Sequence, residues 1–276
     1  MLGFLSHVMV LKNKIKGMIA QGGIAFGGVS HIPSTAIVEL MGIAGYDFDL
    51  IDTEHGMYDV DTAGELIRAA SGVGLTPIVR VLQNDPGLIM KAFDLGAEGV
   101  VVPHVVSKDD AERAVRAAKY HPEGERGSCP FIAAAGYSLY DWAVYQEAAN
   151  RETMVIVLIE DREGVENIDE ILSVKGIDAV FLGPFDMSVG MGQRGDALHP
   201  DVQGNLDRVI TACRMRNVPV MSAVLDAKDV AKWIDKGARL FVHASDTELL
   251  ARASASFVES ASVFRKRLAR PNAPSH

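Results

Sequence analysis

Eight short apolar segments recur along this chain of 276 residues, and stretches with helical spacing separate them. The apolar segments comprise residues 24–26, 48–51, 77–79, 99–102, 155–159, 179–182, 218–221 and 240–242. Strict alternation of strands and helices is typical of a parallel sheet, and eight repeats predict its closure into a (β/α)8 TIM barrel. A doubly wound open sheet is the structural alternative, but no GxGxxG motif follows the first segment to support it.

The length of the chain is close to the ~250 residues typical of one such barrel, so we expect a single domain over residues 1–268. The start of the chain, residues 1–11, is apolar, but it precedes its lysines and is too short to span a bilayer. We interpret it as a leader helix packed on the domain. Residues 269–276 predict a disordered tail.

Two stretches depart from the alternation of strands and helices. Residues 120–152 form a long connection rich in glycine and aromatic residues, which is typical of a lid or a binding loop. Residues 247–268 predict a helix that either packs on its own barrel or reaches a neighbouring subunit.

The charge and the cysteines of the chain limit its partners and its compartment. Acidic residues outnumber basic ones 36 to 27, which argues against binding to a phosphate backbone, so we expect no nucleic acid partner. Without a membrane-spanning run we expect no membrane partner either. Cys129 and Cys213 lie far apart with no CxxC spacing, which favours a reducing cytoplasm over a disulfide framework.

Acidic side chains follow several of the apolar segments directly. The fifth segment runs into Glu160, and the sixth runs through a Gly-Pro turn into Asp186. Because the carboxyl ends of parallel strands meet at one end of a barrel, these carboxylates should lie together. Two hard oxygen ligands with open positions suit Mg²⁺ or Mn²⁺. The alternative is that one acid caps a helix and the other lies on the surface.

A histidine and an arginine accompany these acids. His55 follows Glu54 and lies three residues after Asp52, so a carboxylate could orient its imidazole as a general base. The alternative for His55 is a loop histidine that caps a helix. Arg80 ends the third segment, where a guanidinium could bind a carboxylate and stabilise an enolate, or form a structural ion pair with Asp52 or Glu160.

In these motifs the chain resembles the HpcH/HpaI aldolase family, the metal-dependent class II pyruvate aldolases. The resemblance runs from about Leu11 to Leu268 and rests on IDTEHG, PIVRV, FDLGAEGVVVP, HPEGERG, the IED at the end of the fifth segment, and LGPFDMS. It implies a (β/α)8 barrel with an exchanged C-terminal helix, in a homo-oligomer that is a hexamer or trimer of dimers. It also implies a divalent metal, either Mg²⁺ or Mn²⁺, with Co²⁺ as a further candidate.

The resemblance assigns roles to residues at the strand ends. Catalytic roles fall to His55, Asp52, Arg80 and Asp94, the last in the site of an adjacent subunit; the metal ligands are Glu160 and Asp186; and the residues beside the 2-oxo acid are Arg80, Gly183, Pro184 and Ser188.

The chain departs from the family pattern at three positions. Leu158 stands where members usually carry Gln two residues before the metal ligand, which implies the loss of a hydrogen bond on the substrate side. Phe26 replaces a common Trp, and Phe185 replaces a small residue of the GPxD turn. We expect these changes to narrow or dry the pocket.

The expected function is that of a lyase. It would catalyse the reversible, metal-dependent aldol cleavage of a 4-hydroxy-2-oxo acid to pyruvate, or a related 2-oxo acid, and an aldehyde. A decarboxylase or a citryl-type acyl-CoA lyase on the same barrel is one alternative. A barrel that binds a 2-oxo acid without turnover is the other, and fold alone does not decide between them.

Overall fold

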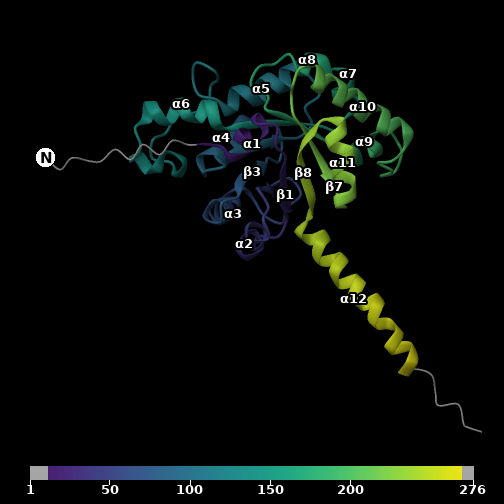
Figure 1. Cartoon of the computed structure of the whole chain (residues 1–276). Helices are drawn as coiled ribbons and strands as arrows, with labels where there is room; N and C mark the ends of the chain where they lie inside the picture. Colours follow the sequence, from purple (N-terminus) through teal and green to yellow (C-terminus); the bar gives the residue numbers. More distant parts are fainter. Residues whose placement is uncertain (1–11, 269–276) are drawn as a thin grey trace, which may run out of the picture.

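The computed structural model describes residues 12–268, and its eight strands close into one parallel barrel (Figure 1). Hydrogen bonds join each strand to the next along the chain and join β8 back to β1. The predicted (β/α)8 TIM barrel is therefore confirmed, and each predicted apolar segment overlaps one strand. The strands are β1 (Ala25–Ser30), β2 (Phe48–Asp52), β3 (Thr76–Arg80), β4 (Gly99–Val102), β5 (Met154–Ile159), β6 (Ala179–Leu182), β7 (Val220–Val224) and β8 (Ala238–Ser245).

Helices surround the barrel and close one end of it. The first helix places Ile15 at 0% exposure among the side chains of the barrel interior, so it plugs the amino-terminal end. The helices are α1 (Lys14–Ala20), α2 (Thr35–Ala44), α3 (Val60–Gly72), α4 (Pro86–Asp94), α5 (Lys108–Ala118), α6 (Trp142–Glu152), α7 (Arg162–Glu166), α8 (Ile168–Ile171), α9 (Pro184–Gly190), α10 (Pro200–Met215), α11 (Ala227–Lys236) and α12 (Asp246–Leu268), with a 3₁₀ helix η1 (Ala133–Ser138).

Two predictions concern the ends of the chain. The leader helix predicted for residues 1–11 and the tail predicted for 269–276 lie outside the described residues. Within residues 12–268, no helix combines the length and the apolar character needed to cross a membrane.

The alternation of side chains along each strand decides which residues reach the barrel interior. Leu50 and Ile78 belong to the interior cluster, whereas Ile51 and Val79 pack in the outer layer under the helices. Because successive side chains of a strand point to opposite faces, residues two positions beyond an interior residue also point inward. The carboxyl-terminal ends of the strands thus project a defined set of side chains over one mouth of the barrel.

The connection at residues 120–152, for which the sequence predicts a lid or a binding loop, is a packed subregion that lies away from the mouth of the chain's own barrel. It joins the end of α5 to the start of β5, which places it toward the amino-terminal end of the strands. Its core is aromatic: the Tyr120 ring lies 5.4 Å from that of Trp142 and 6.2 Å from that of Tyr145, between ring centres. The glycine and aromatic content of this stretch therefore serves a small satellite core.

Asp49 is a fully buried carboxylate in the outer layer of β2. Its neighbours Phe48 and Leu50 point into the barrel, so Asp49 points toward the helices. The Ser30 hydroxyl donates to it at 2.9 Å. Burial raises the pKa of Asp49 to about 7, the hydrogen bond from Ser30 opposes this shift, and the charge of Asp246 adds to it.

We expect Asp49→Asn to flatten the dependence of the unfolding free energy on pH. The unfolded chain releases this proton near pH 3.8 and the folded chain holds it to about pH 7, so ionisation costs the fold stability as the pH rises through that window. At about 1.4 kcal/mol per pH unit, the wild type should lose up to roughly 4 kcal/mol relative to the variant. Urea unfolding of both proteins across this range measures the difference, and parallel stability curves would contradict the argument.

Candidate active site

Charged side chains from neighbouring strands meet at the carboxyl-terminal mouth of the barrel. Asp52 and Arg80 lie two positions beyond the interior residues Leu50 and Ile78, and Glu160 lies two beyond Leu158. All three therefore face the mouth from the inner side of the strands. The prediction that these residues gather at one end of the barrel agrees with this arrangement.

Arg80 is held between two carboxylates. Its Nε donates to Asp52 Oδ1 at 2.8 Å, and its Nη2 donates to Asp52 Oδ2 at 2.5 Å. Its Nε also lies 3.3 Å from Glu54 Oε2 in an ion pair. The structural ion pair with Asp52 is present, and this double contact fixes the plane of the guanidinium at the edge of the mouth.

Asp52 binds a different imidazole from the one that its spacing predicts. The imidazole Nε2 of His31, which follows β1, lies 2.8 Å from Asp52 Oδ2, whereas Asp52 Oδ1 accepts the backbone N–H of His55 at 3.3 Å. Burial by itself would raise the pKa of Asp52. The hydrogen bonds from His31 and Arg80 and the charge of Arg80 outweigh burial and hold that pKa well below its usual range.

The imidazole of His55 lies at the surface of the mouth. Its side chain is 61% exposed, and its Nε2 is 3.9 Å from Glu54 Oε2. The carboxylate nearest to the His55 imidazole is therefore Glu54 and not Asp52, which the spacing predicts. His31, by contrast, uses both ring nitrogens within the protein, because its Nδ1 lies 3.3 Å from the hydroxyl of Thr247.

Glu160 is a buried acid at the centre of the mouth. It is 4% exposed, and its Oε1 accepts the backbone N–H of His104 at 3.0 Å. Burial raises the pKa of Glu160 to about 7; the hydrogen bond and the charge of His104 oppose this shift, while the charge of Asp186 adds to it. The charge of Asp186, the other predicted metal ligand, thus acts on Glu160.

The residues around Glu160 fit a divalent cation. Among the described residues Glu160 pairs with His104 Nδ1 at 3.3 Å but with no lysine or arginine, so no permanent cation compensates the charge of this buried carboxylate. Gly183 provides the room: a Cβ at this position would lie 2.4 Å from the Cβ of Glu160 and 3.1 Å from its Oε2. Carboxylate oxygens with open space beside them are the donors that Mg²⁺ and Mn²⁺ prefer.

Two of the predicted substrate contacts lie inside the protein. Ser188 is 0% exposed and donates its hydroxyl to the carbonyl of Phe185 at 2.7 Å, so it supports the turn before Asp186 and does not face the mouth. Leu158 is 2% exposed and belongs to the barrel interior directly below Glu160. Its side chain lies beside Gly183 and forms the apolar floor of the site.

Asp94 and Phe26 lie away from the mouth of this chain, whereas Phe185 belongs to the exposed turn between β6 and Asp186. Asp94 ends α4 and pairs with Arg126 at 2.7 Å, so any catalytic contribution would have to reach another subunit. Phe26 stacks on Phe241 at 5.6 Å between ring centres in the outer layer, which makes the prediction that it narrows the catalytic pocket wrong. Phe185 is 62% exposed.

Two further histidines, His31 and His104, lie at the mouth, and neither is among the residues predicted from the sequence. Each stands just past the end of an apolar segment, the first directly after Ser30 and the second after Pro103. The signal that identified Glu160, a polar residue following a buried strand, would have identified both.

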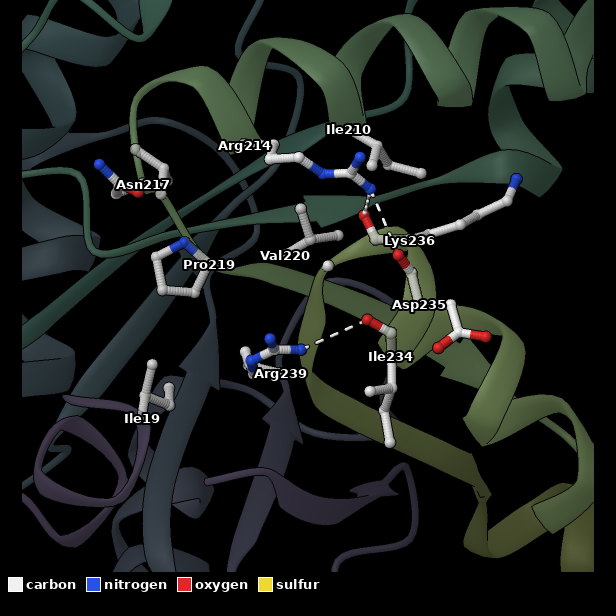
Figure 2. A pocket seen from close by; sticks show the side chains of 12 residues that line it. Ile19, Ile210, Arg214, Asn217, Pro219, Val220, Ile234, Asp235, Lys236 and Arg239 are labelled. Atoms are coloured by element: carbon white, nitrogen blue, oxygen red, sulfur yellow. Dashed lines mark hydrogen bonds between the residues drawn. The ribbon is translucent and has the colours of Figure 1, made fainter. Parts of the chain in front are cut away.

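A separate cavity lies at the opposite end of the barrel, and arginine and lysine side chains line it (Figure 2). Its volume is about 410 Å³, and Arg214, Lys236 and Arg239 are among its lining residues. Arg214 donates to the carbonyls of Asp235 and Lys236, and Arg239 donates to that of Ile234. These cations stabilise the carboxyl end of α11 and are not free to bind a substrate.

Comparisons with known proteins identify the kind of enzyme. The model of the HpcH/HpaI aldolase/citrate lyase family matches residues 31–253. A 5-keto-4-deoxy-D-glucarate aldolase of Escherichia coli O157:H7 (strain EC4115 / EHEC) is 31% identical over 237 residues, which cover 86% of this chain and 92% of that protein.

Two solved structures agree with this match. An HpcH/HpaI aldolase/citrate lyase family protein from Burkholderia cenocepacia J2315 is 29% identical with a TM-score of 0.85, covering 91% of this chain and 100% of that one. The citrate synthase SbnG is 29% identical with a TM-score of 0.83, covering 91% and 98%. The fold, the charged mouth and these relatives define an enzyme of the aldolase and lyase type. The chain belongs to the HpcH/HpaI aldolase/citrate lyase family.

Proposed function

We propose that this protein is a divalent-metal-dependent aldolase that cleaves a 4-hydroxy-2-oxo acid to pyruvate, or a related 2-oxo acid, and an aldehyde. The observation that carries the proposal is Glu160, a buried carboxylate without a lysine or arginine partner in the described residues. The same mouth holds Arg80, which pairs with Asp52, and His55, which lies near Glu54. Membership of the aldolase family supports the reaction type.

The reaction requires a proton carrier and a cation for the developing negative charge. Cleavage removes the proton of the C4 hydroxyl, breaks the bond between C3 and C4, releases the aldehyde and returns a proton to C3. Glu160 and Asp186 would hold the metal, and the metal would supply positive charge that lowers the free energy of the enolate. Arg80 would donate to the same end of the substrate, since Asp52 already fixes its orientation.

We assign the proton transfer to His55. Its imidazole is 61% exposed, and its Nε2 lies 3.9 Å from Glu54 Oε2. His31 is the weaker candidate because Asp52 and Thr247 occupy both of its ring nitrogens. We assign His31 to holding Asp52, and through it Arg80, in position.

A panel of aldol reactions tests the proposal. Pyruvate, hydroxypyruvate and oxaloacetate would each be incubated with several aldehydes, with and without Mn²⁺, and 5-keto-4-deoxy-D-glucarate would be offered for cleavage. We expect aldol products that form only with the metal and that EDTA abolishes reversibly. Equal turnover in metal-free protein, or decarboxylation of oxaloacetate without any aldol product, would contradict the proposal.

Because of Leu158, we expect the enzyme to have only a weak preference for pyruvate as its 2-oxo acid. Its apolar side chain lies directly below Glu160 and offers no hydrogen bond to a 2-oxo acid, so we expect Leu158→Gln to raise kcat/KM for pyruvate by roughly 10-fold. Leu158→Met, which keeps the volume and the apolar surface, is the matched control. Steady-state kinetics of the two variants decide the matter, and identical values would show that this position has no role in substrate choice.

We also propose that α12 covers a neighbouring subunit in a closed oligomer. The helix points away from its own barrel (Figure 1), and it exposes apolar side chains at Leu250, Phe257 and Phe264, which recur every seven residues and so share one face. Where an eighth covering helix would pack, a cavity of about 320 Å³ lies between α2 and α11 over β8 and β1, lined mainly by apolar groups. We propose that an α12 from another copy fills this opening.

We therefore expect a homo-oligomer, most simply a hexamer, that a single charge on α12 disrupts. Phe257→Lys should dissociate it, because a buried lysine without a partner is strongly unfavourable. Ser262→Lys adds the same charge on the other side of the helix and should leave the assembly intact. Native mass spectrometry of the three proteins measures the outcome, and a monomeric, active wild type would refute the exchange.

A further inference from the structure

His104 occupies an unusual position at the centre of the mouth. It follows β4 and Pro103, and its backbone φ is 51°, in the left-handed region that residues other than glycine seldom adopt. The histidine keeps this conformation because its backbone N–H donates to Glu160 Oε1 at 3.0 Å. The same conformation brings its imidazole over the carboxylate.

The imidazole of His104 is surrounded by carboxylates. Its Nδ1 lies 3.3 Å from Glu160 Oε1 and 2.9 Å from Asp161 Oδ2, and its Nε2 lies 3.9 Å from Glu54 Oε1. Among the described residues, His104, Glu160 and Asp161 form a group whose ligand atoms all lie within 4.8 Å of one another. The other oxygen of Glu54 is buried and accepts no hydrogen bond, although Arg80 lies beside it.

The separations of Nδ1 from Glu160 and Asp161, of which the second is a hydrogen bond in this structure, are close to the edges of a metal coordination sphere. Adjacent ligand atoms of an octahedral ion with bonds of about 2.1 Å stand roughly 3 Å apart. Imidazole nitrogen is a ligand for most divalent transition metals, and a metal-bound imidazole commonly directs its other nitrogen toward a carboxylate. In this site Nδ1 would be the ligand, and the N–H at Nε2 would face Glu54.

We propose that His104 supplies a nitrogen ligand to the divalent ion held by Glu160. This inference rests on the metal dependence proposed above and deepens it, because it changes which ion the site prefers. Oxygen-only sites suit Mg²⁺ and Mn²⁺, whereas an imidazole ligand raises the affinity for later transition metals such as Co²⁺ relative to both. The site would therefore bind Co²⁺ more tightly than an oxygen-only site does.

Pulsed electron paramagnetic resonance of the Mn²⁺-loaded full-length protein tests the ligand directly. We expect nitrogen coupling to Mn²⁺ in the wild type, a changed coupling pattern after ¹⁵N-histidine labelling, and loss of the coupling in both His104→Ala and His104→Gln. His199→Ala, which alters a histidine that caps the start of α10, is the matched control and should keep the coupling.

Calorimetry on the same proteins supplies a second measurement. Loss of His104 should weaken Mn²⁺ binding on the order of 10-fold or more and weaken Mg²⁺ binding less. Mn²⁺ bound without nitrogen coupling in the wild type, or a coupling that survives both His104 variants, would overturn the assignment while leaving metal dependence in place. Failure of Mn²⁺ to bind the wild type would instead refute the proposed metal-dependent function itself.

Discussion

Glu160→Gln is expected to reduce aldol turnover by roughly 10³-fold or more while the protein stays folded. The variant keeps the shape of the side chain but removes the charge that would hold the metal, and with it the stabilisation of the enolate. Because burial raises the pKa of Glu160 to about 7, the neutral amide should be at least as stable as the acid above that pH. Asp186→Asn should reduce turnover similarly.

The measurements are turnover, thermal unfolding and Mn²⁺ binding on the same preparations. Glu163→Gln, a change of the same chemistry at an exposed acid of α7, should leave all three unchanged. If Glu160→Gln binds Mn²⁺ and turns over like the wild type, the metal does not bind at this acid.

Arg80→Lys is expected to lower turnover by roughly 10- to 100-fold, the second largest effect. Lysine keeps the charge but cannot make two parallel hydrogen bonds to Asp52, so the cation is no longer fixed toward the mouth. The loss should fall mainly on kcat, since the contact strengthens as negative charge develops on the substrate.

Arg216→Lys provides the comparison. Arg216 pairs with Asp169 at 2.8 Å on the surface, and exposed pairs of this kind contribute little to stability. Its replacement should change neither kinetics nor stability. Wild-type kinetics in Arg80→Lys would show that Arg80 only braces the barrel mouth.

The order of the strands and the gathering of acids at the mouth could be predicted because both follow from local patterns. A buried parallel strand reads as an apolar run, and the barrel brings every such run to the same end. Glu160 and Arg80 were predictable for this reason. Each of them lies two residues beyond the last inward-facing residue of its own strand.

Contacts between neighbouring strands could not be predicted from spacing alone. Asp52 pairs with His31 because β1 lies beside β2, and the nearness of His55 along the chain carries no information about that register. The aromatic stretch at 120–152 has the composition of a lid, yet its place between a helix and the next strand puts it at the other end. The prediction for Phe26 was wrong for a similar reason: side chains alternate along β1, and the side chain of Phe26 points outward.

The junction between β8 and α12 links the outside of the molecule to its chemistry. Asp246, the first residue of α12, accepts the backbone N–H groups of His31 and Ile32, at 3.1 and 3.0 Å. His31 in turn holds Asp52, which holds Arg80. A neighbouring subunit that binds α12 would therefore stabilise the position of the Arg80 guanidinium through these contacts. The activity of one barrel would then depend on whether its neighbour is bound.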